Sequence, residues 1–239
     1  MSPGVYLAVC VVLVVASTVQ SSAGFGHGLV AAPVLRLLHP ELLPGPIVVA
    51  GLAVAIGVAR RNSTRADLPE MVPALSGRVV GNGVALALLV VLSDRGLSIA
   101  IGATVLAFVG LRWAGVGVPR TNRSLAGAGV VSGVGGTIAA LGGAPMALLY
   151  EQHASARNFR GPMGWYTLFG GSLSVLTLAL AGEYDADAIR DAALLLPPIA
   201  VGSYLSRWGT PLLDRGYLRP LVLGLSATSA ALLVAGEIL

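Results

Sequence analysis

Two glycine-rich interruptions hold the residues of this sequence best suited to bind a ligand. The first follows an almost uninterrupted apolar run over residues 5–19, and the second lies in an equally apolar stretch beyond residue 124. Glycine costs about 1 kcal/mol and proline about 3 kcal/mol in a helix interior relative to alanine, so both clusters predict broken helices. The candidate substrate-binding residues are Gly24, Phe25, Gly26, His27 and Gly28 in the first cluster, and Gly142, Gly143 and Pro145 in the second.

A broken helix frees backbone N–H groups that suit an anion, because the N-terminus of a half-helix carries partial positive charge. Inside a membrane, such groups are tolerated only where protein or a water-filled cavity satisfies them. The alternative is close helix packing, since Gly24 and Gly28, like Gly77 and Gly81, fit the small-xxx-small pattern. We expect the two breaks to line a binding site and Gly77 and Gly81 to serve packing.

Arg78 is the only arginine well inside an expected apolar span, away from its ends, and Asn82 follows four residues later on the same helix face. Charged residues within membrane spans are expensive, rare and usually functional. Arg78 and Asn82 are therefore added to the candidate substrate-binding residues. The alternative is that Arg78 snorkels toward the basic loop that precedes its span.

His27 lies at the first break, where a group that titrates near neutrality can bind or release a proton. The alternative is a histidine that only hydrogen-bonds freed carbonyl groups. Cys10 is the single cysteine, which excludes an intrachain disulfide and a cysteine metal site. The chain has no lysine and hence no phosphate-binding G-x-x-x-x-G-K-[ST] loop. We predict no catalytic residues, no metal site and no cofactor, and we do not expect an enzyme.

The composition indicates a polytopic all-α membrane protein. Hydrophobic residues make up 55% of the 239 positions and charged residues 11%, whereas soluble domains carry about 25% charged residues. A single helix over residues 4–38 would be about 50 Å long, too long for a hydrocarbon core of about 30 Å. It must break, and the first glycine cluster is where it can. Ten apolar segments are expected, over residues 4–22, 25–38, 44–59, 71–92, 96–113, 124–141, 143–152, 162–182, 188–206 and 218–236.

The arginines predict how these segments are oriented. If each broken pair returns the chain to its starting side, eleven arginines fall on one side and three on the other. Basic residues mark the cytoplasmic side of a membrane protein. The arrangement with this strongly biased count is therefore favoured over one in which each broken pair crosses the membrane only once. It places both termini outside and residues 60–65, 120–123 and 215–219 in the cytoplasm. The expected location is the cytoplasmic membrane of a bacterium. No nucleic-acid motif is found, and aromatic residues make up only 5%.

The two halves of the chain resemble each other. Aligning Pro33 with Pro145 places Gly24 on Gly136, and later "PALSG" (73–77) is similar to "PIAVG" (198–202). We therefore expect one integrated membrane domain made of two repeats, over residues 1–116 and 117–239. Each repeat has an odd number of elements, five, so the two should be inverted relative to each other. Inverted repeats with broken helices near the midplane recur among transporters.

Four motifs together resemble the sulfite exporter TauE/SafE family of membrane transporters. They are "GFGHGLVAAPVL" (24–35), "GVVSGVGGTIAALGGAPMALLY" (129–150), "NFRGPMGWYTLFGG" (158–171) and "LLLPPIAVGSYLSRW" (194–208). The resemblance implies transport of a small anion, either sulfur-containing, such as sulfite, a sulfonate or sulfoacetate, or a short carboxylate. We expect alternating access around a central site at the two breaks. A passive channel for small solutes is the alternative. The expected partners are the anion and the lipid bilayer, with proton coupling and homo-oligomer formation left open.

Overall fold

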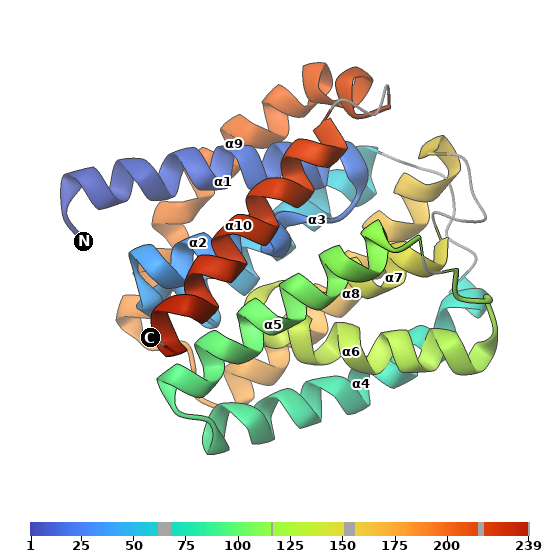
Figure 1. The fold of residues 1–239 in the computed structure, drawn as a ribbon, viewed down its shortest axis with the longest axis horizontal. Helices are drawn as coiled ribbons and strands as arrows, with labels where there is room; N and C mark the ends of the chain where they lie inside the picture. The colour runs from blue at the N-terminus through green and yellow to red at the C-terminus, as the bar shows by residue number, and fades with distance from the viewer. Residues whose placement is uncertain (62–67, 116, 151–155, 215–217, 239) are drawn as a thin grey trace.

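The computed structural model describes residues 1–61, 68–115, 117–150, 156–214 and 218–238, and these fold into α-helices without strands (Figure 1). Each expected apolar segment corresponds to one helix, so the all-α polytopic fold is confirmed. Five helices of the described chain, within α1, α4, α5, α8 and α9, are long and apolar enough to cross a membrane. The helices are α1 (Pro3–Ala23), α2 (His27–Leu38), α3 (Gly45–Arg61), α4 (Leu68–Val91), α5 (Asp94–Trp113), α6 (Asn122–Ala139), α7 (Ala144–Tyr150), α8 (Ala156–Leu180), α9 (Ala186–Asp214) and α10 (Leu218–Ile238), with a 3-10 turn η1 (Pro40–Leu42).

The helix starts differ in how they are capped. At three of them a hydroxyl side chain accepts a hydrogen bond from the first turn: Ser2 before α1, Ser93 before α5 and Thr121 before α6. The residue before α2 is Gly26, which has a left-handed backbone (φ 111°) and offers no side-chain cap. The sequence thus closes these three helix starts with side chains but leaves the first turn of α2 to other partners.

The first break is narrower than the sequence predicted, and the second begins two residues earlier. The first spans only Gly24 to Gly26, because His27 and Gly28 already form the first turn of α2. The second spans residues 140–143, and Pro145 belongs to the first turn of α7, a position that tolerates proline because its N–H would have no helical partner. The prediction that residues 24–28 and 142–145 are non-helical was therefore wrong for His27 and Gly28, which lie in α2, and for residues 144 and 145, which lie in α7.

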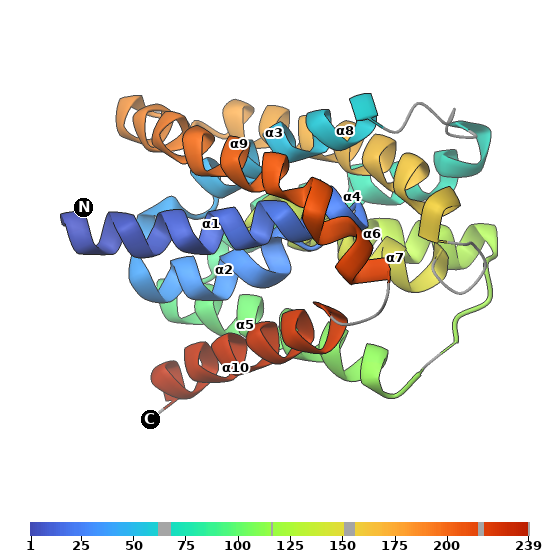
Figure 2. The same cartoon turned by 90° about the horizontal axis from the view of Figure 1, so that it is seen from above.

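The helix pairings repeat between the halves of the chain. α4 packs along α6 and α9 along α1, while α3 contacts α8 and α5 contacts α10. A Cβ added to Gly77 would strike the carbonyl of Ala126, and one added to Gly202 would strike that of Val14. Val14 and Ala126 are as far apart in sequence as Gly24 and Gly136, which the repeat alignment matched. α1 and α6 run in opposite directions in Figures 1 and 2. The repeat boundary after residue 116 and the inversion across a membrane remain predictions.

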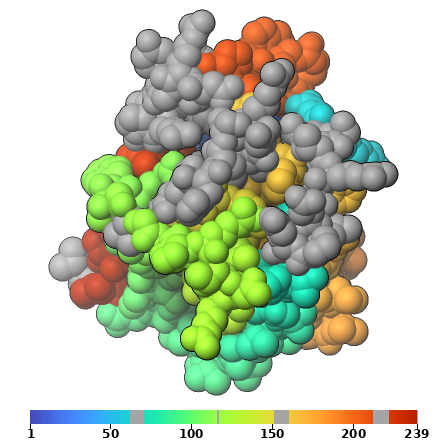
Figure 3. All heavy atoms as spheres, turned by 90° about the vertical axis from the view of Figure 1, so that its right-hand side faces the viewer, coloured from blue at the N-terminus to red at the C-terminus, as the bar shows by residue number. Residues whose placement is uncertain are grey.

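Both chain ends lie at the same end of the helices (Figure 1). The connection from α5 to α6, which carries Arg120 and leads to Arg123 in the first turn of α6, lies at the opposite end, seen from outside in Figure 3. This arrangement has the termini and this basic connection at opposite ends, as the arginine count requires. Arg65 and Arg215 lie outside the described residues. Which end faces the cytoplasm remains a prediction.

Candidate functional site

The two helix breaks contact each other at the centre of the molecule. A Cβ added to Gly28 would lie 2.6 Å from the carbonyl carbon of Ala140, and one added to Gly143 would lie 2.6 Å from the Cβ of Phe25. Contacts this close leave no room for a side chain, so glycine is needed on both sides. Residues more than a hundred positions apart, which the sequence matched as equivalent interruptions, thus meet in one place.

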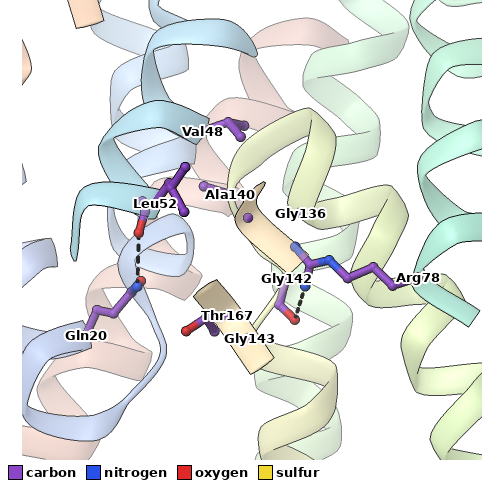
Figure 4. A pocket seen from close by; sticks show the side chains of 11 residues that line it. Gln20, Val48, Leu52, Arg78, Gly136, Ala140, Gly142, Gly143 and Thr167 are labelled. Carbon is purple, nitrogen blue, oxygen red and sulfur yellow. Dashed lines mark hydrogen bonds between the residues drawn. The ribbon is translucent and has the colours of Figure 1, made fainter. Parts of the chain in front are cut away.

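A small pocket of about 30 Å³ opens beside these breaks (Figure 4). Its volume is well below the roughly 300–1,000 Å³ of sites for drug-sized ligands, and it has room for about two water-sized groups. Three predicted site residues, Arg78, Gly142 and Gly143, line it. The polar groups enter from opposite sides, Gln20 from α1 and Arg78 from α4. The lining residues are Gln20, Val48, Gly51, Leu52, Arg78, Gly136, Ala140, Gly142, Gly143, Thr167 and Gly171.

Arg78 is buried, with 2% of its surface exposed, and its guanidinium reaches the second break. Nη1 donates to the Ser132 hydroxyl at 2.9 Å and to the Gly142 carbonyl at 3.4 Å. The guanidinium carbon lies 5.4 Å from the centre of the Tyr166 ring. Arg78 therefore extends toward the centre of the molecule and does not follow the snorkelling alternative.

The charge of Arg78 is not compensated by any carboxylate that the structure describes. Within those residues the ion pairs involve other cations, and the Nε of Arg78 has no hydrogen-bond partner. A buried ion without its counterion costs several kcal/mol, even after relaxation. The opposite case is Arg36 on α2, also buried, which pairs with Asp94 at 2.9 Å and donates to Ser98. Arg78 is thus a buried cation with only neutral oxygen partners.

Close helix packing brings Arg78 to this position. A Cβ on Gly77 or Gly81 of α4 would collide with the backbone of α6, and one on Gly129 or Gly133 of α6 with that of α4. The backbones of α4 and α6 therefore lie in direct contact. The packing role expected for Gly77 and Gly81 is the one that the geometry shows. Because α6 is so near, the Arg78 side chain can pass beside it to the second break.

Asn82 lies one turn beyond Arg78 but does not line the pocket. With its amide nitrogen toward the Arg78 carbonyl and the Thr137 hydroxyl, its oxygen accepts from the Ser174 N–H and the Thr177 hydroxyl, at 3.0–3.3 Å. The side chain joins α4, α6 and α8. Its position supports helix packing near the site rather than ligand contact.

Gln20 and His27 organise the first break. The His27 backbone N–H donates to the Gln20 side-chain oxygen at 3.2 Å, and the Gln20 amide donates to the Gly51 carbonyl at 3.4 Å. Gln20 thereby supplies the cap that Gly26 lacks. The His27 side chain is fully buried, and neither ring nitrogen has a hydrogen-bond partner among the residues that the structure describes. Bonding of the ring to freed carbonyls, the alternative for His27, is thus not seen within that part of the chain.

Several predicted residues lie near the pocket without lining it. Phe25 and Gly28 contact the second break, Gly24 and Gly26 pack against α8 and α1, and Pro145 lies in the first turn of α7. Three residues were missed: Ser132, Tyr166 and Thr167. Their hydroxyls sit in the two glycine motifs over residues 129–150 and 158–171 and are buried in the structure, but no sequence signal separates them from the other hydroxyl residues of such spans.

The chemistry of the pocket suits the binding of an anion. In the described residues no group of histidine, cysteine and carboxylate side chains could hold a metal ion. The pocket presents a fixed positive charge, a side-chain amide and the Thr167 hydroxyl, which donates to the Met163 carbonyl at 2.8 Å. A cation with neutral hydrogen-bonding neighbours attracts an anion.

Comparison with known proteins identifies one family. The model of the family described as sulfite exporter TauE/SafE matches residues 9–233, nearly the whole chain. No curated protein and no solved structure matches the chain. The match includes both helix breaks and every residue that lines the pocket.

Proposed function

Because the chain belongs to the sulfite exporter TauE/SafE family of membrane transporters, we propose that it carries a small anion by alternating access around the pocket between its two breaks. The family implies transport of sulfur-containing anions such as sulfite. The proposal also includes three other candidate substrates: a sulfonate, sulfoacetate or a short carboxylate. The observation that carries it is the buried guanidinium of Arg78, which has no described carboxylate partner and lines the pocket.

An oxyanion matches what Arg78 offers. Guanidinium presents five N–H donors in a planar fork and stays charged at any working pH. Charge-assisted hydrogen bonds from such a group to oxyanions are about twice as strong as neutral ones. The pocket is small, which favours an anion of a few heavy atoms over a larger metabolite.

Alternating access is supported by how the halves pack. The pocket is lined by α1, α3 and α4 from the first half and by α6, α8 and the second break from the other. The pairs α4 with α6 and α9 with α1 repeat the same close crossing. A rocking movement of one half of the chain against the other would expose the pocket to each side of the membrane in turn.

His27 gives the proposal a place for a coupling proton. The ring is buried beside the first break, and its Cδ2 lies 3.7 Å from a Cβ built on the pocket-lining Gly51. A titratable ring so near the pocket can link proton binding to anion binding. Proton coupling and a homo-oligomeric state are both parts of the proposal that need direct measurement.

Counterflow in proteoliposomes tests the proposal against a channel. Vesicles loaded with unlabelled sulfite and diluted into ³⁵S-sulfite should accumulate label transiently, and initial rates should saturate with concentration. A passive channel equilibrates the label without overshoot and without saturation. Competition by methanesulfonate, sulfoacetate and acetate ranks the substrate classes. Absence of overshoot for all of these anions would refute alternating-access transport.

A further inference from the structure

Three glycines enclose the Arg78 guanidinium. A Cβ built on Gly136, Gly142 or Gly170 would collide with its terminal atoms. At Gly170 all three nearest atoms belong to Arg78, namely Cζ, Nε and Nη1. Gly136 and Gly142 also line the pocket, and the atom nearest to each is Nη2. The guanidinium therefore lies in a slot with its Nη2 edge toward the pocket.

Two hydroxyl groups fix the other edge of the guanidinium. Ser132 accepts from Arg78 Nη1 at 2.9 Å and from the Tyr166 hydroxyl at 2.7 Å, and itself donates to the Gly142 carbonyl. Both side chains are buried. Tyr166 lies four residues before Gly170 on α8, so the two share a helix face. One face of α8 thus supplies both a hydroxyl and an empty space for the same arginine.

We propose that Gly170, together with Ser132 and Tyr166, positions Arg78 so that its Nη2 edge meets the transported anion. The inference rests on the proposed function, because it assigns how the same pocket recognises its anion. Nη1 is occupied by Ser132 and Gly142, which leaves Nη2 for the ligand. Without the space at Gly170 the guanidinium would be displaced from this orientation. Gly170, Ser132 and Tyr166 are positioning residues; none of the three lines the pocket.

The Gly170→Ala variant tests this inference, with Gly83→Ala as the matched control. Gly83 lies on α4, and a Cβ there meets nothing within 4 Å. Alanine favours helix formation over glycine at both positions. We expect Gly170→Ala to weaken binding of anaerobic sulfite and methanesulfonate at least tenfold, measured by titration calorimetry on purified protein. Gly83→Ala should bind within twofold of the parent. Equal affinity in the parent and Gly170→Ala, or an equal loss in Gly83→Ala, would overturn the inference.

A second measurement does not depend on anion binding. Thermal unfolding of a double-mutant cycle compares Gly170→Ala in the parent and in Arg78→Gln. If the slot holds Arg78, the added methyl lowers Tm in the parent and raises it in Arg78→Gln, where the guanidinium is gone. The same Tm shift in both backgrounds would overturn the positioning role. If the two substitutions are coupled in this cycle but the parent protein binds no anion, the positioning role stands and only the proposed function is overturned. Tyr166→Phe, which keeps the ring but loses the hydroxyl, should weaken binding about threefold.

Discussion

Replacing Arg78 by glutamine is the most direct perturbation of the proposed site. The substitution removes the positive charge but keeps a side-chain amide that can still donate a hydrogen bond. Ser132 continues to donate to the Gly142 carbonyl and to accept from Tyr166. The hydroxyl network therefore retains its own partners, and no carboxylate among the described residues loses a counterion.

The expected magnitude follows from the burial of the guanidinium. A hydrogen bond to a charged group contributes about 1.5–3 kcal/mol, and each 1.4 kcal/mol is a factor of ten in affinity. Loss of the charge-assisted contact should therefore weaken anion binding about 10- to 150-fold. Unfolding should not become easier, because removing a buried, uncompensated charge relieves a desolvation cost of several kcal/mol.

Titration calorimetry and thermal unfolding of the same purified samples measure both effects. Arg78→Lys should recover part of the affinity, since it keeps the charge but loses the planar fork. The matched control is Arg36→Lys, which alters a buried arginine that is already paired with Asp94, away from the pocket. A folded Arg78→Gln protein that binds sulfite as tightly as the parent would refute a binding role for Arg78.

Three further outcomes are expected. In a cysteine-free background, single cysteines at positions 63 and 185 should be labelled from opposite sides, with Asp185 reached from outside; labelling of both from one side would contradict the inverted arrangement. His27→Gln should abolish uptake driven by a proton gradient in proteoliposomes while counterflow persists, and His39→Gln, which alters the partly exposed partner of Glu41, should behave as the parent; gradient-driven uptake that survives in His27→Gln would exclude this proton site. Asp94→Asn should change the free energy of unfolding by no more than about 1 kcal/mol in thermal unfolding, because the Asp94 side chain is 94% exposed and its carboxylate is screened by solvent, and because Arg36 keeps its hydrogen bonds to the Ser98 hydroxyl and the Asp94 backbone carbonyl; a larger loss would show that the ion pair to α2 is a main tether.

The elements could be predicted from the sequence because hydrophobic length and glycine content determine where helices start and stop. Gly24 and Gly26 adopt positive φ angles of 89° and 111°, as an interruption built from glycine permits. The second break was harder to place, because the left-handed residue there is Ala140 and glycine was the expected signal. Gly136, matched with Gly24, lies inside α6, so the two breaks differ in position by about one helical turn.

The site could be predicted only in part, because spacing along one helix does not reveal what the neighbouring helix contributes. Arg78 stood out as a lone charge in an apolar span. Asn82 shares its face, yet it bonds Thr137 and Ser174 on two other helices and lies away from the pocket. Ser132 and Tyr166 carry no charge, and only the packing of α4 against α6 and α8 brings them to the guanidinium. Serine and tyrosine are too common in such spans to be singled out from sequence.

The uncompensated charge of Arg78 gives a physical reason why the proposed transport cycle would proceed only with an anion bound. Closing the pocket on both sides without an anion would leave the guanidinium dehydrated with neutral partners only. That desolvation cost is several kcal/mol, and at 1.4 kcal/mol per factor of ten it would make empty closure at least a hundredfold rarer than closure with an anion bound. A bound anion supplies the missing counterion and removes the penalty. Movement between the two open states would then be tied to occupancy, which separates a transporter from a channel and predicts exchange faster than net efflux from anion-loaded vesicles.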